Sequence, residues 1–394
     1  MKSGWTRVAL GDVARIVGGA TPKTAVPEYW DGDVAWATPK DLSTRGTKGI
    51  GSTDRSITAQ GLASCAAEVL PPGSVLLSSR APIGLVALTT RPMATNQGFK
   101  SLIPGRRIDA SFLYWWLRSN RRLLESRGNG ATFKEISKAV VQRIEIPLPP
   151  IGEQRCIATV LDHVAALRGI RQQGMTLFDA LTASMFESAV RESDGRVVAL
   201  GDHLAFLTSG SRGWARYYVD EGSPFLRIQN VRNGRLHLND LAFVAPPVTA
   251  ESRRTETQPG DVLLSITADL GRTAVIPESL GRAYVSQHLA ILRSTTVDPR
   301  FLSNFLGSPR GRNELMKKNK GQTKDGLNFD DIRSVAIPVV ARETQERVAH
   351  QLAQVELNRS RTESHLAELD ALFASLQARA FAGELDVSKL VLPA

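Results

Sequence analysis

Cysteine is almost absent from this chain. Only Cys65 and Cys156 occur among 394 residues, and their spacing fits no metal-binding motif. Two cysteines cannot build a disulfide framework, so a reducing, cytoplasmic setting is expected. The sequence also lacks an apolar run long enough to span a bilayer, and its opening residues, "MKSGWTRVAL", lack the apolar segment of a secretory signal. These absences predict a cytoplasmic globular protein.

Familiar catalytic motifs are missing as well. The sequence contains no GxxxxGK[ST] phosphate-binding loop and no GxGxxG turn after a strand, so nucleotide and dinucleotide sites lack support. It has no Asn/Asp-Pro-Pro-aromatic tetrapeptide, which marks amino-methylating enzymes. The six histidines are scattered, with no pair at metal-binding spacing. We therefore expect neither a catalytic site nor a metal site in this chain.

Positive charge is what the chain has in excess. Its 49 basic and 39 acidic residues give a formal net charge of +10. Residues 152–196 carry five basic and six acidic side chains, and residues 341–394 carry six and eight, so the remaining segments hold +13. Two basic blocks joined by nearly neutral connectors suit a polyanionic partner such as nucleic acid. Charge alone fits an ordinary basic surface equally well.

An internal repeat is the second conspicuous feature. Several short motifs occur twice, at offsets between 187 and 191 residues. They are "VALGD" at 8–12 and 198–202, "PGSVLLS" at 72–78 with "PGDVLLS" at 259–265, "TNQGF" at 95–99 with "VSQHL" at 285–289, "GAT" at 130–132 with "GQT" at 321–323, and "IPLPPIGEQ" at 146–154 with "IPVVARETQ" at 337–345. The halves diverge between these anchors. We favour one scaffold carrying two recognition surfaces over an old duplication with neutral drift.

Each half has the pattern of a mixed α/β domain. The runs "GSVLLSS" and "DVLLSIT" are short and apolar and follow Pro-Gly turns, which is typical of buried strands. Residues 109–126 and 298–318 predict helices opened by Asp, the second interrupted at Pro309. The predicted fold class is α+β, with two α/β domains in tandem and two long helices. The predicted segments are 1–150 and 197–340 for the globular domains, 151–196 for a central helix, and 341–394 for a C-terminal helix and tail.

The two connectors carry apolar residues at alternating spacings of four and three, which is typical of a helix packed along another helix. Matching Arg168 with Arg359 and Phe178 with Phe373 predicts that the second helix is four residues longer. Antiparallel pairing is favoured over separate packing of each helix on its own domain. The predicted seam residues are Ile157, Leu161, Val164, Phe178 and Leu181 in the first helix, and Val348, Leu352, Val355, Leu366, Leu369, Phe373 and Leu376 in the second.

This plan resembles the DNA-specificity subunit of type I restriction–modification enzymes. The resemblance covers nearly the whole chain, although "TSGSRGWARYY" at 208–218 departs from the opening motif of the first half. It rests on "GGATPKTAVPEYWDGDVAWATPKDL" at 18–42, "TNQGFKSL" at 95–102, the repeated "IPLPPIGEQ" joint and "LFASLQARAFAGEL" at 372–385.

The resemblance implies two target-recognition domains that each read half of a split DNA sequence. The paired helices would act as a ruler and as the dock for two methyltransferase (modification) subunits. Those subunits would bring S-adenosylmethionine, and restriction subunits would bring ATP- and Mg-dependent translocation and cleavage. The chain itself would be non-catalytic and hold no cofactor. The alternatives are a specificity subunit of a related type II system, a stand-alone DNA-binding regulator, and an enzyme with an unfamiliar site.

Candidate DNA-binding residues follow from side-chain chemistry. Arg, Asn and Gln pair best with base edges, whereas basic loops suit phosphates. The candidates are Lys23, Lys40, Arg80, Asn96, Gln97, Lys100, Arg127, Thr132 and Lys134 in the first half, and Arg212, Arg227, Gln229, Asn230, Arg272, Gln287, His288, Lys318, Lys320, Thr323 and Lys324 in the second. Gln97 and Gln287 occupy the same place in the repeat, where a structural amide is the alternative. The four tryptophans of the first half's helices and strands (Trp30, Trp36, Trp115, Trp116) are expected in the core.

Overall fold

The computed structural model describes residues 4–130, 134–193, 195–232, 234–319 and 326–387. These residues divide into two compact units. Unit 1 comprises Met1–Arg171 and His365–Ala394, and unit 2 comprises Gln172–Ser364, so both units contain a stretch of each long helix. The finer division at residues 150, 196 and 340 stays a prediction. No helix in the described ranges is long and apolar enough to cross a membrane.

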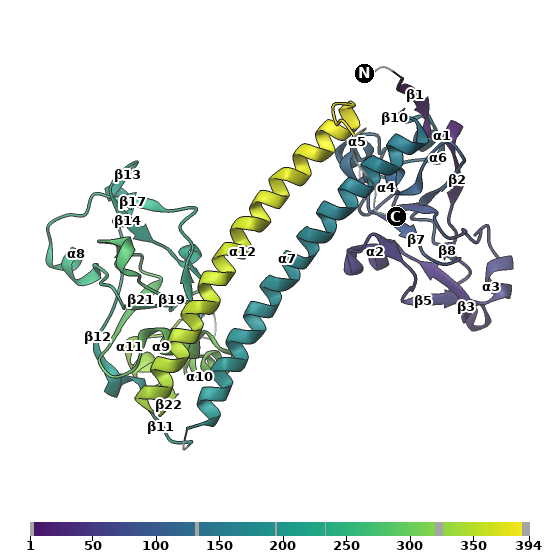
Figure 1. Ribbon diagram of the computed structural model, residues 1–394. Helices are drawn as coiled ribbons and strands as arrows, with labels where there is room; N and C mark the ends of the chain where they lie inside the picture. Colours follow the sequence, from purple (N-terminus) through teal and green to yellow (C-terminus); the bar gives the residue numbers. More distant parts are fainter. Residues whose placement is uncertain (1–3, 131–133, 194, 233, 320–325, 388–394) are drawn as a thin grey trace. The chain divides into compact units, whose positions relative to one another are not determined.

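Unit 1 is built on a five-stranded sheet with the strand order β2-β9-β6-β7-β4 and on a smaller sheet with the order β5-β3-β8. The pairings in the larger sheet are antiparallel except between β4 and β7. Figure 1 shows the small sheet and α2 at one end of this unit, away from α1 and α6. The strands are β1 (Thr6–Ala9), β2 (Ala14–Gly18), β3 (Trp30–Ala37), β4 (Gly49–Ile50), β5 (Arg55–Ile57), β6 (Val75–Leu77), β7 (Val86–Thr89), β8 (Ala94–Thr95), β9 (Lys100–Pro104) and β10 (Glu145–Leu148), and the helices are α1 (Leu10–Val13), η1 (Pro27–Tyr29), α2 (Pro39–Arg45), α3 (Ala59–Ala63), α4 (Ala110–Ser119), α5 (Arg121–Ser126) and α6 (Lys138–Arg143).

Local sequence explains where the helix predicted at residues 109–126 departs from the structure. Asp109 caps α4 by accepting a hydrogen bond from the Phe112 amide at 3.0 Å, as expected. The helix then breaks at Asn120, and α5 follows as a separate element. The Asn120 side chain donates to the Trp116 carbonyl at 2.9 Å. Such a side-chain bond competes with the backbone ladder, so the single predicted helix was wrong.

Unit 2 repeats this plan with a four-stranded antiparallel sheet, β12-β21-β18-β19, and a second sheet, β13-β17-β14-β20. Ser308 separates α9 from α10, which begins at Pro309, and this confirms the predicted interruption. The strands are β11 (Val197–Ala199), β12 (Leu204–Ser209), β13 (Tyr218–Val219), β14 (Ser223–Leu226), β15 (Val231–Arg232), β16 (Arg235–Leu236), β17 (Ala242–Val244), β18 (Val262–Ser265), β19 (Thr273–Val275), β20 (Tyr284–Val285), β21 (Leu289–Ser294) and β22 (Ala336–Pro338), and the helices are η2 (Leu200–His203), η3 (Trp214–Tyr217), η4 (Ile228–Asn230), α8 (Ala250–Thr255), η5 (Glu278–Leu280), α9 (Pro299–Gly307), α10 (Pro309–Lys318) and α11 (Phe329–Arg333).

Burial follows the apolar pattern of the sequence. The predicted strands "VLL" of β6 and "VLLS" of β18 are fully buried. The four tryptophans expected in the core have exposed fractions between 1% and 8%, which confirms that prediction. The main core of unit 1 includes residues of α7 and α12 as well as α4. In each unit, the long helices therefore pack into the globular core as well as against each other.

The helices α7 (Ile151–Arg191) and α12 (Arg342–Ala382) form an antiparallel coiled coil (Figure 1). In unit 1, the guanidinium of Arg168 pairs with the carboxylate of Asp370 at 2.5 Å. In unit 2, Arg359 pairs with Asp179 at 2.5 Å. From Arg168 to Asp179 the chain advances eleven residues along α7, and their partners, Asp370 and Arg359, lie eleven residues apart in the reverse order along α12. This is the register of antiparallel helices. Polar residues within the seam set this register by pairing across it.

The predicted difference in helix length was wrong. Both helices have 41 residues, and both ends are related by the same offset of 191 residues. The prediction paired Phe178 with Phe373 because both are aromatic. The repeat instead continues at offset 191 as "DALTASM" at 179–185 and "DALFASL" at 370–376. A four-residue stutter is therefore absent between the matched positions.

Most predicted seam residues are at least partly buried. Leu181 is the exception, with 46% exposure, and its repeat equivalent Leu372 is 47% exposed. Leu181 was therefore assigned to the wrong face, and the half-buried Thr182 takes the position equivalent to the buried Phe373. The buried seam residues are Ile157, Leu161, Val164, Val348, Leu352 and Phe373, and the half-buried ones are Phe178, Val355, Leu366, Leu369 and Leu376.

Candidate DNA interface

A buried glutamine joins each globular domain to the helix that follows it. Gln154 in the first turn of α7 is fully buried. Its Oε1 accepts from the Asp109 amide at 2.8 Å, and its Nε2 donates to the carbonyls of Arg107 and Pro149 at 3.0 and 2.8 Å. Gln345, at the same place in α12, accepts from the Asp298 amide at 2.9 Å and donates to Val340 at 2.8 Å. The repeated "GEQ" and "ETQ" are thus the joints between domain and helix.

Four loops come together in unit 1, and we call their described residues the rim of unit 1: residues 19–24, 79–84, 95–100, and 127–130 with 134–135. The Ala20 amide donates to Thr95 O at 2.9 Å, and Ser79 N donates to Gly98 O at 2.7 Å. The Ile136 amide in turn donates to Ser79 O at 2.9 Å. Three predicted DNA-binding stretches, distant in sequence, therefore lie side by side.

Unit 2 has the same construction, and its rim comprises residues 210–213, 266–271, 286–288 and 326–327. The Ile266 amide donates to His288 O at 3.0 Å, and Leu327 N donates to Ile266 O at 3.0 Å. These two bonds are the repeat equivalents of those made by Ser79 and Ile136. Gly210 N donates to Leu289 O at 3.2 Å and brings in the first loop. The same backbone connections thus hold two different sets of side chains.

A close backbone approach explains a glycine in the first rim loop of each unit. A Cβ on Gly19 would lie 1.9 Å from Asn96 O, and one on Gly210 would lie 2.0 Å from Val285 O. No side chain fits at these distances, so only glycine allows the loop to pack against its neighbour. The two positions are 191 residues apart, as the repeat requires.

On the rim of unit 1, two predicted cations share one carboxylate. The Lys100 Nζ lies 3.0 Å from the Glu135 carboxylate, and Arg80 lies 3.9 Å from it. In the first loop, Thr21 donates to the Gln97 amide oxygen. Basic groups that are pre-positioned by a carboxylate can exchange it for a phosphate or a base edge. The rim of unit 1 is therefore strongly cationic in character.

On the rim of unit 2, neutral polar groups contact one another. Thr267 Oγ1 and His288 Nδ1 are 2.6 Å apart, and the Gln287 amide nitrogen lies 3.2 Å from His288 Nε2. Arg272 is held by Asp269 at 2.6 Å. A chain of amide, imidazole and hydroxyl groups offers a different donor and acceptor pattern from that of unit 1, as two unlike half-sites would require.

The other candidates lie near these loops or outside the described residues. Lys40 on α2 is 3.6 Å from Asp54, and both Arg227 and Gln229 bind Asp240. Thr132, Lys320, Thr323 and Lys324 lie outside the described ranges. The exposed candidates are Lys23, Lys40, Gln97, Arg127, Lys134, Arg212 and Gln229, and the half-buried ones are Arg80, Asn96, Lys100, Arg227, Arg272, Gln287, His288 and Lys318.

Asn230 was wrongly assigned to DNA binding. Its side chain is only 1% exposed. The amide oxygen accepts from Arg227 N at 3.0 Å, and the amide nitrogen donates to His237 O and Asp240 O at 2.9 and 3.1 Å. Asp41 does the same work in unit 1, where it is equally buried and accepts from two backbone amides. Asn230 therefore shapes the loop that carries Arg227.

Two cations that the sequence did not single out tie each globular domain to its helix. Lys48, just before β4, lies 2.5 Å from Asp162 on α7. Arg235 in β16 lies 2.9 Å from Glu356 and 3.1 Å from Glu363 on α12. Burial of the Arg235 guanidinium opposes its charge, yet the hydrogen bonds that it donates to these glutamates raise its pKa above the ordinary value. Lys48 precedes β4 and Arg235 lies in β16. Only the packing of these segments beside the long helices identifies the two cations, and the sequence does not show that packing.

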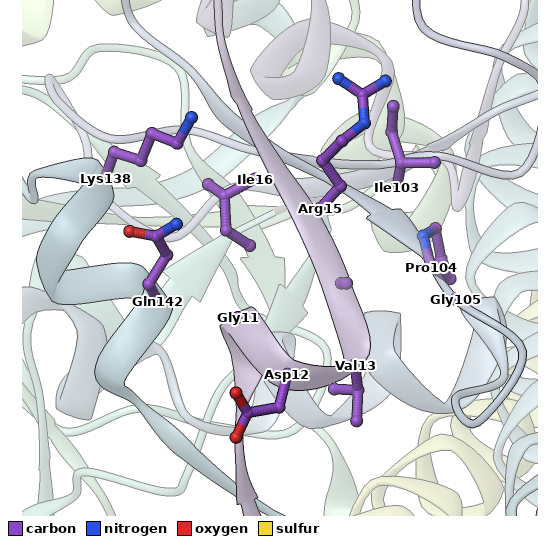
Figure 2. Close-up of a pocket in the computed structure, with 11 residues that line it drawn as sticks. Gly11, Asp12, Val13, Arg15, Ile16, Ile103, Pro104, Gly105, Lys138 and Gln142 are labelled. Carbon is purple, nitrogen blue, oxygen red and sulfur yellow. The ribbon is translucent and has the colours of Figure 1, made fainter.

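A pocket in unit 1 lies along β2, with Asp12 of α1 on one side and Lys138 and Gln142 of α6 opposite (Figure 2). Arg15, at its edge, is paired with Glu68, and this hydrogen bond lowers the pKa of the glutamate. The lining contains no histidine, cysteine or hydroxyl nucleophile. Among the described residues, no group of acidic, histidine or cysteine side chains could hold a metal ion.

Comparison with known proteins gives a family. The model of the type I restriction modification DNA specificity domain matches residues 2–173 and 216–370 of this chain. The chain belongs to this family. The two matched ranges cover both glutamine joints, the rim of unit 1 and the rim of unit 2 except for residues 210–213, so the family assignment includes both halves of the repeat.

Curated relatives are specificity subunits of type I restriction enzymes. The MjaIX subunit of Methanocaldococcus jannaschii is 30% identical over 254 residues, or 58% of this chain and 59% of the relative. The EcoBI subunit of Escherichia coli is 22% identical over 315 residues, or 70% of this chain and 65% of the relative. The alignments thus span less than two thirds of either relative. The solved S subunit from M. genitalium shares the fold, with a TM-score of 0.60 and 16% identity over 96% of each chain.

Proposed function

We propose that this chain is the non-catalytic DNA-recognition subunit of a type I restriction–modification complex. Each globular domain reads one half of a bipartite target, and the coiled coil of α7 and α12 sets the separation between the halves. The observation that carries this proposal is the pair of rims. Equivalent backbone hydrogen bonds build them, but Arg80, Lys100 and Glu135 interact on the rim of unit 1, whereas Thr267, Gln287 and His288 interact on the rim of unit 2.

Two recognition domains built on one scaffold explain why the two halves of the sequence diverge between the repeated motifs. Conserving the backbone connections keeps each rim in shape, while exchanging the side chains changes the base edges that it can pair with. The net positive charge outside the helices supplies the phosphate contacts that give affinity and register without sequence information. The paired helices carry a slight negative charge and are suited to protein partners rather than to DNA.

The proposed partners divide the chemistry among them. Two modification subunits dock on the complex and bring S-adenosylmethionine for adenine methylation. Restriction subunits add ATP- and Mg-dependent translocation and cleavage. The curated relatives carry the name of specificity subunits of type I restriction enzymes, which supports this assembly.

The methylated motif tests this proposal. The chain is expressed with its modification subunits in a host lacking adenine methylation, and methylated sites are sequenced genome-wide. The expected result is one motif in two specified parts separated by a gap of fixed length. Methylation should require both this chain and the modification subunits. A continuous motif, or methylation by the purified chain alone, would contradict the proposal.

The matched variants Gln97→Ala and Gln287→Ala assign the two halves of the motif. These glutamines occupy equivalent positions on the two rims, so we expect each variant to relax a different half-site. Gln173→Ala serves as control because Gln173 is exposed on α7 and belongs to neither rim. If both rim variants relax the same half, the assignment of one half-site to each unit is wrong.

A further inference from the structure

Arg55 is held against two tryptophans in unit 1. It opens β5 and pairs with Trp36 across the antiparallel β3–β5 ladder. Its guanidinium carbon lies 3.6 Å from the centroid of the Trp30 ring and 5.6 Å from that of the Trp36 ring. The two indoles are themselves in edge contact at 5.1 Å. The guanidinium is thus stacked on a buried aromatic pair, which fixes its plane.

The same tryptophans hold the first rim loop. Trp30 Nε1 donates to Lys23 O at 3.3 Å, and Trp36 Nε1 donates to Ala20 O at 3.0 Å. Arg55 and this loop are therefore held by the same two indoles. The β3 strand also continues into the rim, because Ala37 O accepts from the Asn96 amide at 3.0 Å. These contacts place Arg55 beside the candidate DNA-reading surface.

The partners of Arg55 differ from those of Arg80, Lys100 and Lys40. Arg80 and Lys100 are engaged by Glu135, and Lys40 by Asp54. The Arg55 side chain is exposed, and no carboxylate in the described ranges pairs with it. Stacking uses the face of the guanidinium and leaves its N–H edge able to donate. A guanidinium of fixed plane with an available edge matches the paired acceptors of a guanine.

We propose that Arg55 reads a guanine in the half-site recognised by unit 1, by donating two hydrogen bonds to the O6 and N7 atoms of the base. This inference rests on the proposed function. Arg55 is then a specificity-determining residue of one half-site only. In unit 2, the equivalent ladder pair is Phe225 with Ala242, so the arginine has no counterpart there. Trp214 stacks on Phe225 instead, with ring centroids 5.3 Å apart.

A purely structural role makes a different prediction. The stem of an arginine can cover an apolar surface, so Arg55 could serve only as a lid on Trp30. Arg55→Leu preserves apolar cover but removes every donor. Arg55→Lys preserves the charge but loses the planar pair of donors. Guanine reading requires both variants to lose specificity, whereas a lid requires neither to do so.

The experiment sequences the methylated sites made by each full-length variant with its modification subunits. Both Arg55 variants should methylate sites with another base at one guanine position of the first half-site, with discrimination falling about tenfold or more. The second half-site should keep its motif. Arg143→Leu is the control, since Arg143 is an exposed arginine on α6 of the same unit. It should leave the motif unchanged.

Three outcomes would overturn the inference. Unchanged guanine specificity in both Arg55 variants leaves only the lid. Weaker methylation of all sites in Arg55→Leu, with guanine specificity retained in both variants and full activity in Arg55→Lys, identifies a charge contact to phosphate. A wild-type chain that specifies no two-part motif overturns the proposed function together with this inference, whereas the first two outcomes leave the proposed function standing. Thermal unfolding of Arg55→Lys, expected within a few degrees of wild type, shows that altered specificity does not come from misfolding.

Discussion

Replacing Gln154 by leucine tests the joint between the first globular domain and α7. Leucine is close to glutamine in volume, so the change removes hydrogen bonds without leaving a large cavity. Gln154 makes three hydrogen bonds to backbone groups, and its side chain is fully buried. Each such bond contributes about 0.5–1.5 kcal/mol net, and a buried partner left unpaired costs about 1–3 kcal/mol. We expect Gln154→Leu to lower the free energy of unfolding of unit 1 by about 2–4 kcal/mol.

The repeat supplies the matched comparison. Gln345 makes two of the equivalent bonds, so Gln345→Leu should destabilise unit 2 by a smaller amount, about 1–3 kcal/mol. Gln173→Leu, on the exposed side of α7, should change stability by no more than about 0.5 kcal/mol. Urea unfolding followed by circular dichroism and by tryptophan fluorescence measures these differences. If Gln154→Leu unfolds at the same urea concentration as Gln173→Leu, the amide does not hold the joint.

Three further predictions concern the helices, the helix contacts and pH. Four residues can be inserted in both helices, between Arg168 and Asp179 and between Arg359 and Asp370. This should lengthen the gap of the methylated motif by about two base pairs, since four residues add about 6 Å of helix. Insertion in one helix alone should break the Arg–Asp register and abolish methylation. Lys48→Glu should destabilise unit 1, and adding Asp162→Lys should recover part of that loss. A double-mutant cycle of urea unfolding should give a coupling free energy of about 1 kcal/mol. Absence of recovery would show that the ion pair contributes nothing to stability. The hydrogen bond from Arg282 lowers the pKa of Glu256 below its ordinary value of 4.5. The pair therefore stabilises unit 2 above pH 4.5, and this contribution is lost as the pH falls through the lowered pKa. Glu256→Gln should make the stability of unit 2 less dependent on pH in the acid range, and an unchanged dependence would contradict this.

The repeated motifs were sufficient to predict the architecture. Short exact repeats such as "VALGD" and the "IP" joints have a direct structural counterpart, because strand, turn and buried glutamine recur at the same places. The burial of the tryptophans and the break at Pro309 follow from size and from proline chemistry, which depend little on tertiary context. Local rules therefore predicted the scaffold well.

Errors arose where the answer depends on the partner surface. Phe178 and Phe373 were matched by residue type, but a seam position is decided by which face of the helix meets the neighbouring helix and domain. The same reasoning error placed the exposed Leu181 in the seam. Asn230 has the chemistry of a base reader, and only its three backbone partners identify it as structural.

The residues that the sequence missed are those defined by long-range pairing. Arg55 is distant from Trp30 and Trp36 along the chain, and only the β3–β5 register brings its guanidinium onto the indole. The contacts of Lys48 with Asp162 and of Arg235 with Glu363 likewise depend on how a strand packs beside a helix. Composition and spacing carry no signal for such contacts.

Exchange of residues 197–340 for the corresponding block of a relative with a different motif tests the central claim most directly. The hybrid retains unit 1's rim, both helices, the first joint and Gln345 of the second joint, and is expressed with the original modification subunits. The account predicts a methylated motif in which one half-site is new, while the other half-site and the gap length are those of the original chain. A motif that changes in both halves, or in neither, would contradict the assignment of one reader to each half of the target.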